Sequence, residues 1–130
     1  MYDRLEIFNM AQGLATHASA RQSKIATNVA NADTPGFRAQ DIAPFEDSYR
    51  VKGGGGHMRS TRAEHHLTED AGPYSAHAID RPGPSSPNGN TVSLETEMVN
   101  AVEVKQSHEL ALTIYQTSLG ILRTSLGRGR

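Results

Sequence analysis

Apolar residues recur at alternating spacings of three and four near both ends of the chain. Over residues 4–32 the stripe consists of Phe8, Ala11, Ala15, Ala18, Gln22, Ile25, Val29 and Ala32. This spacing is the a/d stripe of a heptad repeat, which is typical of a coiled-coil seam rather than of the broader apolar face of a globular helix. It predicts a long N-terminal helix whose small alanine side chains allow a partner helix to approach closely.

A second stripe with larger side chains runs from Ser93 to about Leu126. It consists of Leu94, Met98, Ala101, Lys105, His108, Leu112, Tyr115, Leu119, Leu122 and Leu126. Ser93 is a favourable N-cap residue, and Gly127 is a residue type that commonly ends a helix. The pattern therefore predicts a long C-terminal helix.

Two seams of similar length at opposite ends of one chain can pair with each other. We therefore expect a mainly α fold in which the N- and C-terminal helices form an antiparallel coiled coil. The side chains expected to pair the helices or to make assembly contacts are Phe8, Ile25, Val29, Leu94, Met98, Leu112, Tyr115, Leu119, Leu122 and Leu126. Further apolar residues, such as Val99 and Ile121, lie off the stripe, so their burial would require the middle region or neighbouring molecules.

The middle region, residues 51–92, has a different composition. It contains seven glycines and four prolines, in stretches such as "KGGGGHM" and "DRPGPSSPNGN". Such a segment buries too little apolar surface to offset its chain entropy, so a flexible or locally turned excursion is predicted, with a short strand near residues 74–79. The expected organisation is residues 1–50 and 93–130 as one coiled-coil domain, joined through this irregular Gly/Pro-rich region.

Candidate chemistry is sparse. The His57, His65, His66 and His77 group could be offered as a metal site, but adjacent histidines point in different directions and no HExxH spacing is present, so mobile surface histidines are favoured. Lys105 and His108 interrupt the second seam, where a role in setting helix register is favoured over catalysis. The sequence has no GxSxG, P-loop or dinucleotide motif, and we therefore predict no enzyme activity, no cofactor and no metal.

The composition argues against several other classes of protein. Thirteen basic and fourteen acidic side chains are spread evenly along the chain, without the basic stripe of a nucleic-acid binder. There are no cysteines, no apolar run long enough to span a membrane and no cleavable secretory signal in "MYDRLEIF".

The stretch "NVANADTPGF", residues 28–37, ends the first helical pattern. Pro35 disfavours helical geometry at Thr34, and Pro35-Gly36 is the favoured central pair of a type II turn. Asp33 and Thr34 can bond nearby backbone groups. Asn28 and Asn31 lie one helical turn apart, and we expect their amides to bond backbone groups either of the emerging chain or of a neighbouring subunit.

The segment "ATNVANADTPGFRA", residues 26–39, resembles the N-terminal signature of the bacterial flagellar axial protein family of rod, hook and hook-associated proteins. The resemblance rests on Asn28, Val29, Asn31, Asp33, Thr34, Pro35, Gly36 and Phe37, and "GNTVSLETEM" and the short length are similar to the proximal rod subunits. It covers residues 1–45 and 87–126 and leaves two sister rod proteins as alternatives.

This resemblance implies a structural subunit of the basal-body rod that transmits motor torque. The implied partners are copies of itself, other rod proteins, a membrane-ring adaptor at the rod base and the flagellar type III export apparatus, which uses no cleaved signal. An export adaptor or chaperone for flagellar subunits is the alternative from another class.

Overall fold

The computed structural model describes residues 2–50, 74 and 76–127. In chain order the elements are helix α1 (Tyr2–Ala30), strand β1 (Gln40–Ile42), the short helix α2 (Phe45–Arg50), strand β2 (Ala78–Asp80) and helix α3 (Leu94–Gly127). The prediction of a mainly helical fold with long helices near both ends is confirmed, and each long helix lies within two residues of its predicted bounds. Among the described residues, no helix is both long and apolar enough to cross a membrane.

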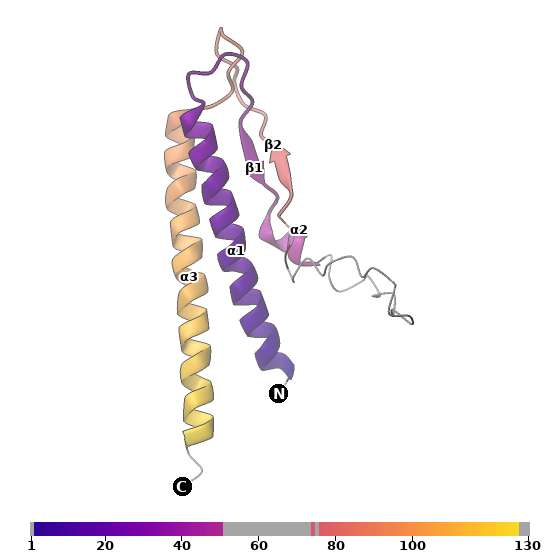
Figure 1. Ribbon diagram of the computed structural model, residues 1–130, viewed down its shortest axis with the longest axis vertical. Helices are drawn as coiled ribbons and strands as arrows, with labels where there is room; N and C mark the ends of the chain where they lie inside the picture. Colours follow the sequence, from indigo (N-terminus) through magenta and orange to yellow (C-terminus); the bar gives the residue numbers. More distant parts are fainter. Residues whose placement is uncertain (1, 51–73, 75, 128–130) are drawn as a thin grey trace, which may run out of the picture.

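Helices α1 and α3 lie side by side and run in opposite directions (Figure 1). Near the start of α1, the ring of Phe8 meets the ring of Tyr115 edge to face, with 5.3 Å between centroids. Near the end of α1, Asn28 reaches Glu97 close to the start of α3. The apolar contact between these two points is thin, because its buried cluster consists of Ala18, Ile25 and Val104.

The face of α3 that meets α1 is displaced by one residue from the predicted stripe. Its buried residues are Glu97, Asn100, Val104 and Ala111, whereas Leu94, Met98, Leu112, Tyr115 and Leu126 are exposed. On α1, Ala11, Ala18 and Ile25 are buried as expected, but Val29 is exposed. The exposure of Val29, Leu94, Met98, Leu112 and Leu126 corrects the expectation that they pack between the two helices of one chain and leaves their assembly role as a prediction, whereas Tyr115 does pair with Phe8 across the helices.

The displacement has a polar cause. The carboxylate of Glu97 is fully buried and is held by Arg81 and Asn28. A buried charge is tolerated only where it is paired and hydrogen-bonded, so this contact fixes how α3 is rotated about its axis. Val104 and Ala111 follow Glu97 at heptad spacing and turn toward α1 with it.

Residues 37–43, here called the strap, run back alongside α1 after the turn (Figure 1). Within the strap, β1 pairs antiparallel with β2, with Asp41 opposite Ile79. The predicted strand near residues 74–79 is thus found slightly later, at Ala78–Asp80. Ala39 and Ile42 of the strap are buried.

Aromatic side chains anchor the far end of the strap to α1. His17 on α1 is buried, its Nε2 donates to the carbonyl oxygen of Ala43 at 2.9 Å, and its ring meets Phe45 and Tyr74 edge to face. A Cβ at Gly13 would lie 3.4 Å from the Phe45 ring, an ordinary contact distance, so the ring packs closely over this part of α1.

Candidate functional site at the end of the first helix

The predicted type II turn is present after α1. Phe37 N donates to Thr34 O at 3.3 Å, which closes a four-residue turn with Pro35 and Gly36 at its centre. Gly36 has a φ of 72°, in the left-handed region that this turn requires at its third residue. Asp33 and Pro35 are exposed and Phe37 is half-buried. The sequence interpretation of Thr34–Phe37 as a helix stop with a fixed exit direction is confirmed.

Asn28 joins the end of α1 to the strap. Its side chain is 1% exposed, its Nδ2 donates to Gln40 O at 2.7 Å, and its Oδ1 accepts from Gln40 N at 3.0 Å. The amide therefore satisfies both backbone groups of one strap residue, as a neighbouring strand would. The same Nδ2 also reaches Glu97 Oε1 at 3.3 Å. The question left open by the sequence is answered for Asn28, because its partners belong to its own chain.

The side chain of Asn31 makes local bonds. Its Nδ2 donates to Thr27 O at 2.9 Å, and its Oδ1 accepts from the hydroxyl of Thr34 at 3.2 Å. Thr27 O also accepts from Asn31 N at 3.2 Å, so the side chain adds a second bond to a carbonyl in the last turn of the helix. The side chain of Asn31 thus reinforces the helix end locally, while Asn28 makes the long-range contact.

Asn90, in the segment before α3, also bonds the backbone at the end of α1. Its Nδ2 donates to three carbonyl oxygens, those of Asn31, Ala32 and Thr34, at 2.8–2.9 Å. Its Oδ1 accepts from Val92 N at 2.7 Å, and the side chain is buried. Asn90 was not predicted as a site residue, because no periodicity or turn signal distinguishes it within "PNGNTV". We call Asn28, Asn31, Asn90 and the turn at Thr34–Phe37 the joint.

A second turn packs against the first. Gly89 N donates to Ser86 O at 2.8 Å, and Gly36 N donates to Asn88 O at 3.0 Å. Gly89 has a φ of 81°, and a Cβ added there would lie 3.5 Å from Gly36 Cα. Two glycine turns thus meet backbone to backbone at the joint.

A chain of alternating charges runs beside the joint. Arg21 on α1 donates to both carboxylate oxygens of Asp41 on β1, at 2.9 and 3.1 Å. Arg81, just after β2, contacts Asp41 at 3.6 Å and pairs with Glu97 on α3. Arg21 also lies 3.7 Å from the more exposed Glu103 of α3. The hydrogen bond to Asp41 raises the pKa of Arg21 above its ordinary value, although burial opposes this shift.

These ion pairs connect all the elements that meet here. They tie α1, the strap, the chain after β2 and α3 into one unit, since each arginine bridges two different elements. None of the four central residues, Arg21, Asp41, Arg81 and Glu97, was predicted as a site residue. Their chemical role emerges only when segments far apart in sequence come together.

The geometry is that of a structural joint. Among the described residues, no three His, Cys, Asp or Glu side chains are grouped as a metal site would require. Of the predicted histidine group, His77 is exposed, and His57, His65 and His66 lie outside the described residues. Lys105 and His108 line a surface groove rather than the helix seam.

Comparison with known proteins places this joint in context. A sequence model described as flagella basal body rod protein matches residues 8–38, which run from Phe8 in α1 through the turn. The flagellar basal body rod protein FlgB of Agrobacterium fabrum is 31% identical, over 87% of this chain and 87% of its own length. The chain belongs to the flagellar basal body rod protein family. FlgB of Salmonella typhimurium is 33% identical over 92% of both chains, and FlgB of Yersinia ruckeri is 31% identical over 88% and 89%.

Membership of this rod protein family agrees with the resemblance drawn from residues 26–39. The family consists of structural components of the flagellar basal body, so the role is structural rather than enzymatic and its location is the basal-body rod. The matched segment includes Asn28, Asn31 and the turn, but it ends before Asn90 and Glu97. The partners of Asn28, which are Gln40 and Glu97, lie beyond the matched segment, so only the fold brings them to Asn28.

Proposed function

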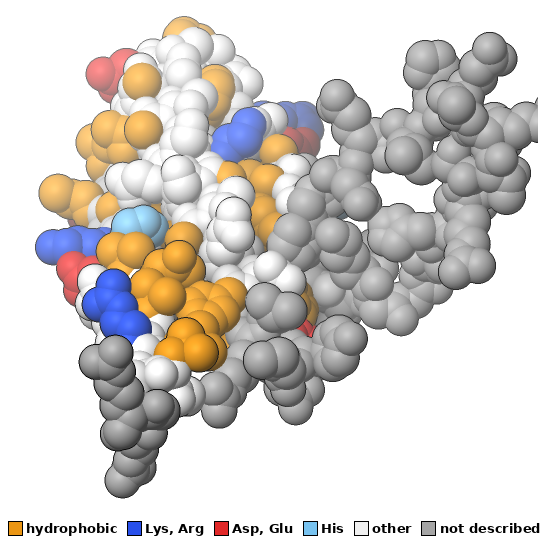
Figure 2. Space-filling view, turned by 60° about the horizontal axis from the view of Figure 1, so that its bottom comes forward, with side chains coloured by type: hydrophobic (Ala, Val, Ile, Leu, Met, Phe, Trp, Pro, Cys, Tyr) orange, Lys and Arg blue, Asp and Glu red, His pale blue; other side chains and the backbone are white. Residues whose placement is uncertain are grey.

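We propose that the protein is a subunit of the proximal rod that assembles helically with its own copies and with other rod proteins into a torque-transmitting shaft. The observation that supports assembly most directly is the exposure of α3. Apolar side chains remain exposed along its length, at Leu94, Met98, Val99, Val102, Leu110, Leu112, Tyr115, Ile121 and Leu126. Contiguous exposed apolar surface is characteristic of protein interfaces. Figure 2 shows hydrophobic side chains gathered on the end of the molecule that faces forward.

In this proposal, residues 1–50 and 93–130 form one domain in which α1 and α3 pair as an antiparallel coiled coil. The heptad-spaced residues Ala11, Ala18 and Ile25 face the heptad-spaced Val104 and Ala111, and this arrangement suits such pairing. The joint fixes where the chain leaves the pair. The exposed stripe, from Leu94 to Leu126, is then the assembly surface rather than the internal seam.

The other partners follow from the family resemblance. We propose contacts with a membrane-ring adaptor at the rod base and delivery by the flagellar type III export apparatus. The relatives at 31–33% identity are all FlgB proteins, which favours FlgB over its sister proximal rod protein. An export adaptor or chaperone would use the same exposed helix face transiently.

Purified basal bodies separate a rod subunit from a chaperone. A tagged copy of the chain, expressed in a deletion strain, is expected to restore swimming and to remain in basal bodies stripped of filament and membrane. A chaperone would restore swimming but would be absent from the stripped particle. Absence of the tagged chain from basal bodies of swimming cells would therefore overturn the proposal.

A further inference from the structure

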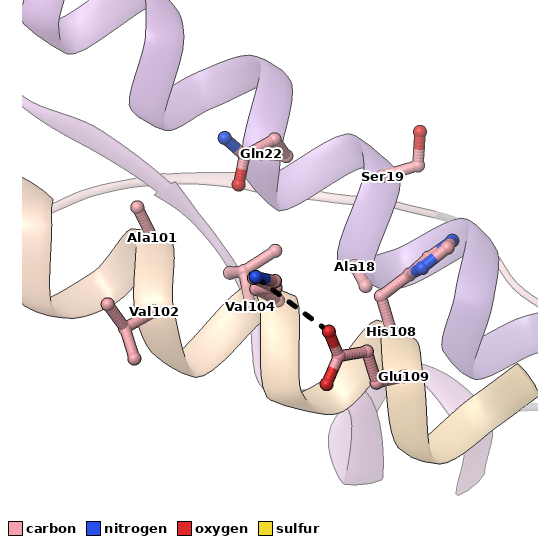
Figure 3. Close-up of a pocket in the computed structure, with 9 residues that line it drawn as sticks. Ala18, Ser19, Gln22, Ala101, Val102, Val104, His108 and Glu109 are labelled. Carbon is pink, nitrogen blue, oxygen red and sulfur yellow. Dashed lines mark ion pairs between the residues drawn. The ribbon is translucent and has the colours of Figure 1, made fainter. Parts of the chain in front are cut away.

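A groove opens on the surface between α1 and α3. Its walls are Ala18, Ser19 and Gln22 from α1 and Ala101, Val102, Val104, Lys105, His108 and Glu109 from α3. Figure 3 shows Ala18 and His108 reaching into the same part of it from opposite helices. Three of the residues that line the groove, Ala18, Ser19 and Ala101, are small. Small residues allow another helix to approach closely.

The groove explains why the predicted stripe failed inside the chain. Ala18, Gln22, Ala101, Lys105 and His108 were all predicted to lie on helix seams, and all of them line this groove. Heptad stripes on two helices that converge on an open groove are the arrangement expected when a third helix completes the bundle. The pattern is therefore a seam whose remaining member is not among the described residues.

The C-terminal end of α3 is nearly free of charge and could contact such a groove. Between Leu110 and Gly127, α3 has a single charged residue, Arg123. Figure 1 shows α3 continuing past the start of α1, and the contact of Phe8 with Tyr115 places about the last one and a half turns beyond Tyr2. Leu126, in this projecting end, is 82% exposed. No described residue covers it.

The charges of the two surfaces are also complementary. The groove wall carries Glu109, whose carboxylate makes only a 3.9 Å contact with Lys105, and the side chains of both are largely exposed. The projecting end brings the positive charge of Arg123. A helix laid along the groove would gain apolar contact with Val102 and an ion pair with Glu109.

We propose that the projecting end of α3 of one copy docks in the groove between α1 and α3 of the next copy. This inference rests on the proposed assembly function and names the contact that would carry it. Groove and projecting end are different surfaces of one chain, so the contact is head to tail, and repeated contacts of this type build rings or open helical arrays rather than two-fold dimers. A single helix in a groove buries less than a standard stable interface, so the free chain is expected to remain monomeric until neighbours add further contacts.

Cysteine cross-linking tests the contact, because the chain has no native cysteine. Val102→Cys is combined with Leu122→Cys or with Leu126→Cys, and basal bodies from swimming cells are treated with a bismaleimide. We expect at least one pair to give a ladder of dimers and larger multiples of the chain. The matched control combines Ile79→Cys, on β2 and away from the groove, with Leu126→Cys and should give no ladder.

The other outcomes are distinguishable. Rods that contain the double variants but give no cross-link would overturn the docking contact and leave the rod function intact. Dimers alone would indicate two-fold pairing, and cross-links only to a different rod protein would identify another occupant, so either result also overturns the inference. Loss of the chain from basal bodies in the unmodified strain would instead remove the proposed function.

Charge reversal gives an independent readout. Glu109→Arg and Arg123→Glu are each expected to reduce the swimming rate at least several-fold, and the double variant should recover most of it. Circular dichroism of each purified variant checks that the helices are retained. Equal defects in the single and double variants would contradict the pairing.

Discussion

Asn28 uses both atoms of its side-chain amide to bond the backbone of Gln40, which lies twelve residues further along the chain. The amide takes the place of a neighbouring strand, so the backbone of Gln40 is paired on the side facing α1, although the described residues include no third strand. The two bonds also determine which amide atom is nitrogen, because one partner is a donor and the other an acceptor.

Asn28→Asp tests this contact with almost no change in shape. The new carboxylate would replace the donor that faces Gln40 O and Glu97 Oε1 with an acceptor. We expect the free energy of unfolding to fall by at least about 1–3 kcal/mol, the usual cost of leaving a buried partner unsatisfied. Urea unfolding followed by circular dichroism measures the loss. Asn31→Asp, at a half-buried position with local bonds, should cost clearly less, and equal losses would contradict the assigned roles.

Asn90→Ala should loosen the end of α1. Removing one side chain takes a donor away from the carbonyl oxygens of Asn31, Ala32 and Thr34 together, although those of Asn31 and Thr34 keep their bonds from Thr34 N and Phe37 N. Hydrogen exchange of the backbone amides of residues 31–34, 36 and 37 should become faster, while exchange near Ala18 should change little. The control is Asn88→Ala, which removes a single acceptor used by Asn90 N. If Asn88→Ala accelerates exchange as much as Asn90→Ala, the three-carbonyl cap is not the important feature.

Gly36→Ala and Gly120→Ala should shift stability in opposite directions. At Gly36 there is open space for a Cβ, so the cost is conformational and arises from the φ of 72°. A left-handed residue with a side chain costs roughly 1–2 kcal/mol. Gly120 lies in α3, also with open space, where alanine is favoured by up to about 1 kcal/mol. Thermal unfolding of both variants in the purified chain is the measurement, and a neutral Gly36→Ala would argue against the turn assignment.

The sequence predicted the parts of the fold that depend on local chemistry. Pro35 and Gly36 specify their turn almost alone, and the heptad spacing of Ala11, Ala18 and Ile25 identifies the inner face of α1. These features need only residues close in sequence, within one β-turn or about two helical turns.

The parts that failed depend on contacts between distant segments. The periodicity predicted that Leu94 and Met98 would lie on the inner face of α3. Glu97 faces inward instead, because its carboxylate bonds Arg81 and Asn28 there. Pattern reasoning treats a glutamate as a surface residue, since the partner that neutralises it is invisible in sequence. Asn90 was missed for the same reason, as its three acceptors lie more than fifty residues earlier.

Arg81→Ala should be among the most damaging single changes. It leaves the fully buried carboxylate of Glu97 without a counter-charge, and breaking a buried pair in this way typically costs about 3–5 kcal/mol. Lys105→Ala removes one member of an exposed pair on α3 and should change the unfolding free energy by less than about 1 kcal/mol. Urea midpoints of the two variants provide the comparison. A similar small loss for both would show that water reaches Glu97.

Tyr74→Phe should alter stability only in alkaline solution. Burial raises the pKa of Tyr74 above its ordinary value of 10.0 because the phenolate is disfavoured there. The folded state therefore holds this proton more tightly than the unfolded chain, so the contribution is fully present below pH 10 and is lost as the pH rises through the raised pKa. The variant should match the unsubstituted protein at pH 8 and exceed it above pH 10. Parallel curves over this range would contradict the assignment.

The two kinds of contact in this chain differ in how they respond to a twisting load. Apolar contacts such as that between Ala18 and Val104 have no directional requirement, because the hydrophobic effect depends on the buried area rather than on an angle. Hydrogen bonds weaken steeply with angle, so the joint around Asn28 and Asn90 resists rotation of the strap about α1. Under the torque-transmitting role proposed above, the helix pair would be the compliant element and the joint the stiff one, and torsion applied to one end of the subunit would pass through a corner that keeps its angle.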